Sequence, residues 1–184
     1  MAGLLMGDLM LTGDRVRLRA LEPADSEALW RWYHDQEVGR WMNGSPPISL
    51  AQNMEKGANR PRNTFEQMVL GIETLDGGRL IGYVALGDTD FIQGETTLQS
   101  IAIGDHDHRG GGYATDALRL ICRYAFEEMG LHRVMLWVVA DNTAAVRAYT
   151  RVGFVEEGRR RESFRTKGKW HDFLMMGLLE SELK

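Results

Sequence analysis

Residues 101–125 read IAIGDHDHRGGGYATDALRLICRYA, and this stretch decides the fold prediction. An apolar strand ending at Ile103 comes first, three consecutive glycines follow, and apolar residues then recur at helical spacing. Glycine in a helix costs about 0.5–1 kcal/mol relative to alanine, so three glycines at a helix entrance need a reason. Unobstructed backbone N–H groups at the positive end of a helix form a phosphate site. The alternative is a sharp strand-to-helix turn that binds no ligand.

Periodicity, turn residues and caps predict the elements on either side of this stretch. The expected order is a strand (15–21), two helices (from Pro23 to Tyr33, and from a Ser49 cap to Pro61), a hairpin (65–75 and 79–87), a strand (96–103), a helix (111–129), a strand (133–139), a helix (142–152) and a hairpin (154–165 and 169–179). The class is α+β, a mixed α/β arrangement in which antiparallel hairpins surround a single β-α-β crossover. We expect one domain over residues 14–184, preceded by an N-terminal extension at 1–13.

Composition narrows the range of partners and compartments. The 184 residues are 43% hydrophobic and carry a net charge of −4, so no nucleic acid or anionic membrane is favoured as a partner. The first residues lack the basic flank of a signal peptide, and no apolar run is long enough to span a bilayer, so a cytoplasmic protein is expected. The single Cys122 excludes an internal disulfide framework, and its helical neighbours indicate a buried thiol. No histidine pair has a convincing ligand spacing, and no metal is predicted.

Two common phosphate-binding motifs fit the glycines poorly. The dinucleotide fingerprint needs a third glycine where Thr115 stands, and its acidic ribose ligand lies about twenty residues on. The nearest candidate, Asp141, is about thirty residues past the glycines, and the chain after it predicts an antiparallel hairpin instead of further βα units. The Gly-Lys-Ser/Thr ending of a P-loop is absent from the sequence.

Two spaced motifs carry a family resemblance. Arg109-Gly110-Gly111-Gly112-Tyr113-Ala114 matches the Arg/Gln-x-x-Gly-x-Gly/Ala signature of the GCN5-related N-acetyltransferases (GNAT). About thirty residues later, Asn142, Ala145 and Tyr149 followed by Gly153-Phe154 resemble that family's Asn-x-x-Ala-x-x-x-Tyr and Gly-Phe pattern. The element order is also similar, so the resemblance covers roughly residues 14–180. The most similar subgroup contains the ribosomal-protein N-terminal alanine acetyltransferases and their small-molecule relatives, in which homodimers are common.

The resemblance implies acetyl-CoA as the co-substrate, bound between two splayed neighbouring strands. Its pantetheine would lie along the first of these strands, its pyrophosphate would lie on the glycine segment, and the Asn142 side chain would reach it. The implied cofactor-binding residues are Ile101, Ala102, Ile103, Arg109, Gly110, Gly111, Gly112, Tyr113, Ala114, Thr115 and Asn142. Most of these contacts use the backbone, which leaves Ile101 and Ile103 free to pack in the core. Taken alone, Asn142 also suits an ordinary helix N-cap.

The resemblance implies a catalytic role for Tyr149. Tyr149 shares a helical face with Ala145, Ala148 and Val152, which by itself predicts a core residue. In the family, a tyrosine here protonates the departing CoA thiolate after direct attack by the amine, and a backbone N–H near Ile101 would face the developing oxyanion.

The general base is not identified from the sequence. Many relatives have a glutamate early in the cofactor strand, but here the matching position is Leu98, with Glu95 further out. The acceptor is expected to be a primary amine, either a small molecule or a protein N-terminus, held between segments 38–49 and 159–171. An alternative is a non-catalytic acyl-CoA-binding or regulatory module, which the missing glutamate favours and the retained Tyr149 disfavours.

Overall fold

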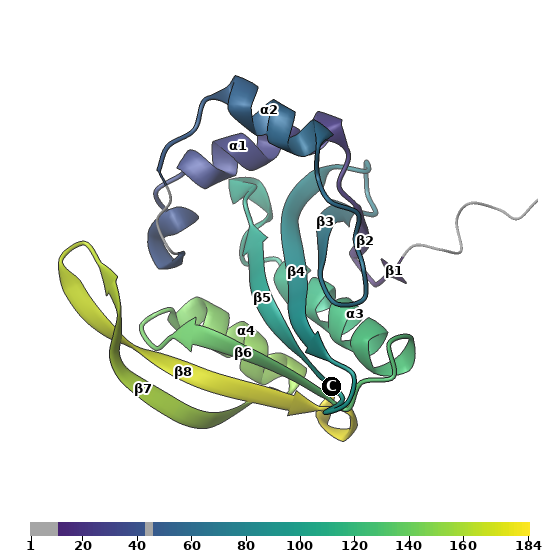
Figure 1. The fold of residues 1–184 in the computed structure, drawn as a ribbon, viewed down its shortest axis with the longest axis vertical. Coiled ribbons are helices and arrows are strands. Elements are labelled where there is room, and N and C mark those ends of the chain that lie inside the picture. The colour runs from purple at the N-terminus through teal and green to yellow at the C-terminus, as the bar shows by residue number, and fades with distance from the viewer. Residues whose placement is uncertain (1–10, 43–45) are drawn as a thin grey trace, which may run out of the picture.

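The structure, a computed structural model, describes residues 11–42 and 46–184. Within them one mixed sheet is combined with helices (Figure 1). The strands are β1 (Leu11–Thr12), β2 (Val16–Ala20), β3 (Met68–Thr74), β4 (Leu80–Asp90), β5 (Glu95–Ile103), β6 (Arg133–Val139), β7 (Val155–Thr166) and β8 (Lys169–Leu179). The α-helices are α1 (Ser26–His34), α2 (Leu50–Ala58), α3 (Tyr113–Glu127) and α4 (Thr143–Val152), and the 3₁₀ turns are η1 (Pro23–Asp25), η2 (Gly39–Trp41), η3 (His106–His108) and η4 (Glu180–Glu182).

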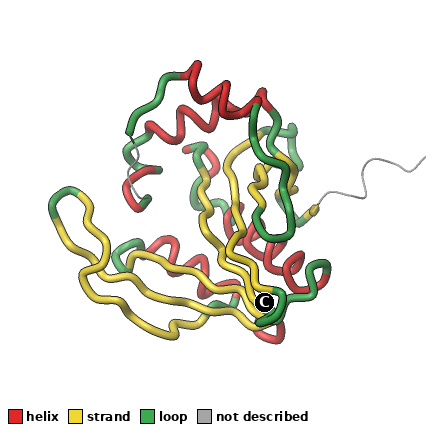
Figure 2. Tube along the Cα trace, viewed as in Figure 1, coloured by secondary structure: helices red, strands yellow, loops and turns green. Residues whose placement is uncertain are grey.

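The sheet order is β1-β2-β3-β4-β5-β6-β8-β7, and the expected α+β class is confirmed. Every neighbouring pair is antiparallel except β5 and β6, which are parallel and joined by α3. This pair is the single β-α-β crossover expected from the sequence. β7 and β8 form a long hairpin that reaches beyond the rest of the sheet (Figure 2).

The edge strand β1 was not expected from the sequence. It consists of Leu11 and Thr12, which pair with Leu18 and Arg17 of β2, and two residues are too few to show a period. The first ten residues of the expected extension lie outside the described residues, as do residues 43–45 of the segment 38–49.

The core lies between the sheet and α3 and α4, which run behind the strands in Figure 1. The apolar face of α3 is fully covered, and Cys122 on it is 0% exposed, as expected. Burial raises the pKa of the Cys122 thiol, which keeps it neutral and unreactive. The thiol is therefore a packing group of the helix that follows the glycines.

A β-bulge and an interrupted strand pairing open the middle of the sheet. Ala85 of β4 pairs with Ser100 and Leu86 pairs with Leu98, so Gln99 is an extra residue in β5. β5 and β6 pair only from Glu95↔Arg133 to Thr97↔Met135. Beyond that point the two strands diverge from a shared end (Figure 1). The divergence creates a gap between two central strands, which is where the site lies.

Helix α1 is held at the far end of β5. A Cβ added to Gly104, the residue after β5, would lie 2.0 Å from Cδ2 of Trp32, so the indole ring rests directly on this backbone. Helix α2 packs on α1, and its first turn has the capping box expected at Ser49, with Gln52 N donating to Ser49 Oγ over 3.2 Å. The segment between these helices is thereby brought to the open end of the sheet.

Candidate active site

A cavity of about 970 Å³ occupies the gap between β5 and β6. One wall is the second half of β5, another is the end of β6 with α4, and the segment before α3 closes one end. The opposite end is formed by the residues after α1 and by the β7–β8 hairpin. Every cofactor-binding residue expected from the sequence lines this cavity except Gly111, whose two neighbours do.

Residues 110–115 present a row of free backbone donors. None of their six N–H groups donates to another described residue. Gly110 and Gly112 have φ angles of +78° and +86°, and Gly112 is the N-cap of α3. L-amino acids rarely adopt this left-handed region, so glycine is needed where the chain turns into the helix. Six unpaired donors at the positive end of a 15-residue helix suit an anion such as a pyrophosphate.

Asp116, in the first turn of α3, fixes this segment to the N-terminal edge of the sheet. Its carboxylate accepts hydrogen bonds from three consecutive backbone N–H groups, those of Asp14 (3.3 Å), Arg15 (2.7 Å) and Val16 (3.0 Å). The Asp116 residue is only 7% exposed. The carboxylate therefore binds the backbone at the start of β2 and leaves the N–H groups at the N-terminus of α3 free.

The second half of β5 has one unpaired edge. Ile101, Ala102 and Ile103 pair with β4 on one side, whereas on the side of β6 the strand has no strand partner after Thr97. Such an edge can receive an extended ligand through backbone hydrogen bonds. The carbonyl oxygen of Ile103 is already used, because Arg109 Nε donates to it over 3.1 Å. The edge available to a ligand therefore lies before the end of the strand.

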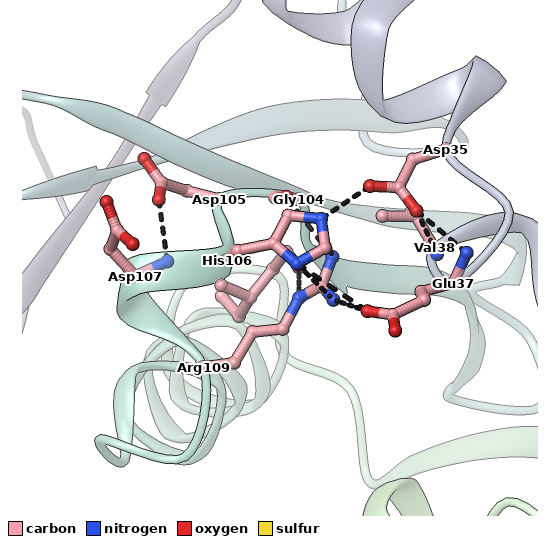
Figure 3. Close-up of polar contacts among 9 residues, drawn as sticks. Asp35, Glu37, Val38, Gly104, Asp105, His106, Asp107 and Arg109 are labelled. Atoms are coloured by element: carbon pink, nitrogen blue, oxygen red, sulfur yellow. Dashed lines mark hydrogen bonds and ion pairs between the residues drawn. The ribbon is translucent and has the colours of Figure 1, made fainter.

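The guanidinium of Arg109 is directed toward Glu37, His106 and Gly104 (Figure 3). Its guanidinium donates to the carbonyl of Gly104 (3.3 Å) and forms an ion pair with Glu37 (2.9 Å), in addition to its bond to Ile103. Its backbone N–H donates to His106 (3.3 Å). Among residues 109–115 the free donors thus begin at Gly110, and Arg109 braces the end of β5 against the segment that follows α1.

A second contact joins the same two segments (Figure 3). Asp35 Oδ2 lies 2.5 Å from His106 Nε2, and Asp35 Oδ1 accepts from the backbone of Glu37 (2.7 Å) and Val38 (3.3 Å). The hydrogen bond with His106 lowers the pKa of Asp35 below its usual value. Sequence reasoning missed this cluster, because its members are polar loop residues more than 70 positions apart with no shared pattern.

Helix α4 brings Asn142 and Tyr149 to the cavity. Asn142 Oδ1 accepts from Ala145 N over 3.3 Å, which is the N-cap reading of this residue. Tyr149 is 8% exposed, and its ring packs edge-on against Phe154 with 5.7 Å between centroids. No described residue hydrogen-bonds its hydroxyl. Burial raises the pKa of Tyr149 to about 12, so the phenol keeps its proton at neutral pH.

The first half of β5 supplies no carboxylate to the cavity. Leu98, at the position where the family resemblance implies a glutamate, is an apolar side chain and is 3% exposed. Glu95 lies where β5 and β6 are still paired, and its carboxylate is 3.6 Å from Arg133. The glutamate expected early in this strand therefore has no counterpart that faces the cavity.

The two segments expected to flank the acceptor do meet at the open end of the cavity. Trp41 and Met42 lie on one side, and Phe164 and Phe173 lie on the other. Thr166 Oγ1 donates to Arg40 O over 3.4 Å, which ties the hairpin to the segment after α1. This end is mainly aromatic and apolar.

Clusters of metal-ligating side chains and membrane-spanning helices are both absent from the described residues. Within residues 11–42 and 46–184, no three His, Cys, Asp or Glu side chains gather as metal ligands would. None of the helices in the described part of the chain combines the length and apolarity needed to cross a bilayer.

Comparison with known proteins identifies relatives of one kind. A family model described as an acetyltransferase (GNAT) domain matches residues 15–155. A probable N-acetyltransferase of Bacillus subtilis (strain 168), YjcK, is 36% identical over 120 residues, which span 64% of this chain and 64% of that protein. The spermidine N(1)-acetyltransferase of Vibrio cholerae is 34% identical over 168 residues, or 91% of this chain and 95% of its own length. A putative ribosomal N-acetyltransferase of Bacillus subtilis, YdaF, is 28% identical over 173 residues, 92% and 93% of the two chains.

Solved structures agree with the sequence comparisons. The crystal structure of spermidine N-acetyltransferase from Vibrio cholerae in complex with CoA and spermine matches with a TM-score of 0.80 and 28% identity, covering 91% of this chain and 96% of that one. The match therefore covers nearly the full length of both chains.

Proposed function

The chain belongs to the GNAT family of acetyltransferases, and from this premise we propose that it moves the acetyl group of acetyl-CoA to a primary amine entering between the segment after α1 and the β7–β8 hairpin. The observation that carries the proposal is the row of six free N–H donors at residues 110–115, which opens on the same cavity as Tyr149 and the unpaired edge of β5. A phosphate-bearing ligand with an extended arm fits this combination of donors and edge.

Each part of the cavity has one task in this proposal. Acetyl-CoA supplies an acyl group activated as a thioester. The donors of residues 110–115 hold its phosphates, and the edge of β5 around Ile101 holds its arm in extended form. A backbone N–H near Ile101 stabilises the negative charge that develops on the carbonyl oxygen, a contribution of about 3 kcal/mol in comparable sites.

Tyr149 is proposed as the general acid. The residue lines the cavity, and its hydroxyl is unpaired among the described residues. The hydroxyl holds its proton because burial raises the pKa of Tyr149 to about 12. A phenol next to a departing thiolate is well placed to protonate it, and the surrounding apolar side chains exclude competing water.

A small cationic amine is the first acceptor class to test. The acceptor end combines aromatic rings with the carboxylate of Glu37, which is 72% exposed and lies beside the cavity. Aromatic faces and carboxylates both attract ammonium groups. The spermidine N-acetyltransferase of Vibrio cholerae, which matches both in sequence and as a solved structure, supports a polyamine. A relative named for ribosomal acetylation supports a protein N-terminus as the second class.

The test measures thiol release from acetyl-CoA with spermidine, spermine and a peptide beginning with alanine, and checks the product by mass. We expect turnover with at least one amine, and we expect CoA, but not NAD, to raise the unfolding temperature. Stabilisation by CoA without turnover on any amine would overturn the proposal in favour of a binding module. Turnover with the peptide alone would move the acceptor to protein N-termini.

A further inference from the structure

Transfer to an amine needs a base, and the described cavity wall offers few. Most amines arrive protonated at neutral pH and attack only after losing that proton. Leu98 cannot accept it, and Glu95 is paired with Arg133 away from the gap. Glu37 is paired with Arg109, and Tyr83 and Tyr149 are buried phenols whose pKa values are raised.

We propose that His171 is the general base, that its Nε2 takes the proton from the acceptor amine directly or through one water, and that Asp141 is the positioning residue that holds its ring. This inference rests on the proposed acetyltransferase function. The two residues come from neighbouring strands: His171 is on β8, and Asp141 lies two residues after the end of β6, which pairs with β8 up to Val139↔Phe173.

The ring is held in one tautomer. Nδ1 of His171 lies 2.5 Å from Oδ2 of Asp141. A carboxylate at this distance takes the Nδ1 proton as a hydrogen bond, which leaves Nε2 as the unprotonated acceptor of the neutral ring. No described residue hydrogen-bonds Nε2. This is the geometry that lets a histidine act as a base.

The ring packs against two residues that line the acceptor end of the cavity. It packs edge-on against Trp41 with 5.5 Å between centroids, and it lies 6.5 Å from the ring of Phe164. Both of these residues line the cavity. The His171 side chain is 11% exposed, so it reaches little solvent elsewhere, whereas Asp141 is 65% exposed.

The charged surroundings of His171 come from three elements. The Asp141 carboxylate contacts it directly. On β8 itself, the neighbouring Asp172 is neutralised by Arg159 of β7 at 3.2 Å. The guanidinium of Arg40, from η2, lies over the ring of Trp41, with 4.7 Å between its Cζ atom and the ring centroid. The contact that faces the imidazole is therefore acidic.

His108 is the competing histidine on the cavity wall. Its Nδ1 lies 3.3 Å from Asp105, and its ring packs against Tyr113 at the glycine end, where the phosphates are proposed to bind. A base at that end would be far from the aromatic acceptor end. His108 is therefore the matched comparison for His171.

The proton balance closes without another reactant. The ammonium group gives one proton to Nε2 and becomes a neutral amine. As the new C–N bond forms and the C–S bond breaks, the sulfur takes the proton of Tyr149, and the second amine proton restores Tyr149. The imidazolium then releases its proton to solvent, so one proton leaves for each acetyl group transferred.

The experiment compares wild type with His171→Gln, Asp141→Asn and His108→Gln, using acetyl-CoA and the amine found active above. In the wild type, kcat/KM should fall on the acid side with one ionisation. In His171→Gln it should drop at least about 100-fold near neutral pH and rise with pH as the amine deprotonates unaided. His108→Gln should keep the wild-type shape, and Asp141→Asn should show an intermediate loss.

A second readout does not depend on turnover. Nitrogen NMR of histidine-labelled protein should show His171 with a protonated Nδ1 and a bare Nε2, and Asp141→Asn should disturb this tautomer. The affinity of His171→Gln for CoA should match that of the wild type. A different result, in which the wild type neither binds CoA nor acetylates any amine, would refute the proposed function itself. A wild-type pH profile in His171→Gln, or a bare Nδ1 in the spectrum, would overturn the assignment. If His171→Gln fails to fold, the Asp141→Asn tautomer shift and profile decide the matter.

Discussion

Tyr149 shows how one side chain can serve the core and the reaction. Its ring packs on Phe154 within the core, and the residue also lines the cavity. Replacing it with phenylalanine keeps the packing area and removes only the proton donor. The position therefore separates structural from chemical effects with a single oxygen atom.

We expect Tyr149→Phe to lower kcat at least about tenfold and to leave CoA affinity nearly unchanged. Because the pKa of Tyr149 is raised to about 12, the phenol is protonated across the usual assay range, so the loss should be similar at each pH below that value. Steady-state kinetics and calorimetric CoA binding measure the two effects. Tyr33→Phe, on a tyrosine that is 44% exposed on α1, is the control. Unchanged turnover in Tyr149→Phe would remove it from the acid role.

Asp116 is a residue whose contribution is to stability. We expect Asp116→Ala to lower the free energy of unfolding by about 2–4 kcal/mol, because three backbone donors lose a charged acceptor and one of them, at Val16, is buried. Urea unfolding measures the change. Asp107→Ala, on an exposed carboxylate in the same region of the chain, should have little effect. Equal effects of the two substitutions would show that the contacts of Asp116 contribute little.

At the scale of elements, the entrance of α3 depends on backbone conformation. We expect Gly112→Ala to weaken CoA binding at least about tenfold, because a left-handed N-cap strains an alanine by about 1–2 kcal/mol and moves the free donors. Gly130→Ala is a matched control: Gly130 follows the same helix with φ +68° and open space for a Cβ. Both variants should lose similar stability in urea, and only Gly112→Ala should lose CoA affinity by calorimetry. Wild-type CoA affinity in Gly112→Ala would contradict phosphate binding by the backbone N–H groups of residues 110–115.

Elements with a clear period were predictable from the sequence. The strand at 133–139 matches β6, and the helix expected at 111–129 is α3 at Tyr113–Glu127. The glycine segment was predictable too, because glycines at a helix entrance have a local physical cause. The direction of the Arg109 side chain was not, since its partner Glu37 is 72 positions away and no local pattern records such a contact. The Gln99 bulge and the Asp141–His171 contact depend in the same way on how strands pair.

At the scale of the whole molecule, the sheet is nearly divided between β5 and β6. Three residue pairs join the β1–β5 part to the β6–β8–β7 part, and α3 packs against both β5 and β6. A ligand in the gap would contact both parts. Binding of a ligand should therefore slow the hydrogen exchange of backbone amides in both parts of the sheet.

We expect CoA to slow hydrogen exchange at residues 101–103 of β5, at 110–115 and at the start of α4, while β2 and β3 exchange as before. Exchange followed by mass spectrometry with and without CoA measures this. The variant Gly112→Ala should lose the protection at 110–115 at a CoA concentration that saturates the wild type. Uniform slowing over the whole sheet would indicate general stabilisation instead of binding in the gap.

The free donors at residues 110–115 belong to the main chain, and this has a consequence for how the protein can change over generations. A peptide N–H is present whatever side chain stands beside it, provided that the chain keeps its path. Purifying selection at this end would then act on a few path-setting positions such as Gly110, Gly112 and Asp116. The acceptor end is built from side chains of other segments, so a lineage can retune its choice of amine by point substitutions there without rebuilding the hold on the donor molecule.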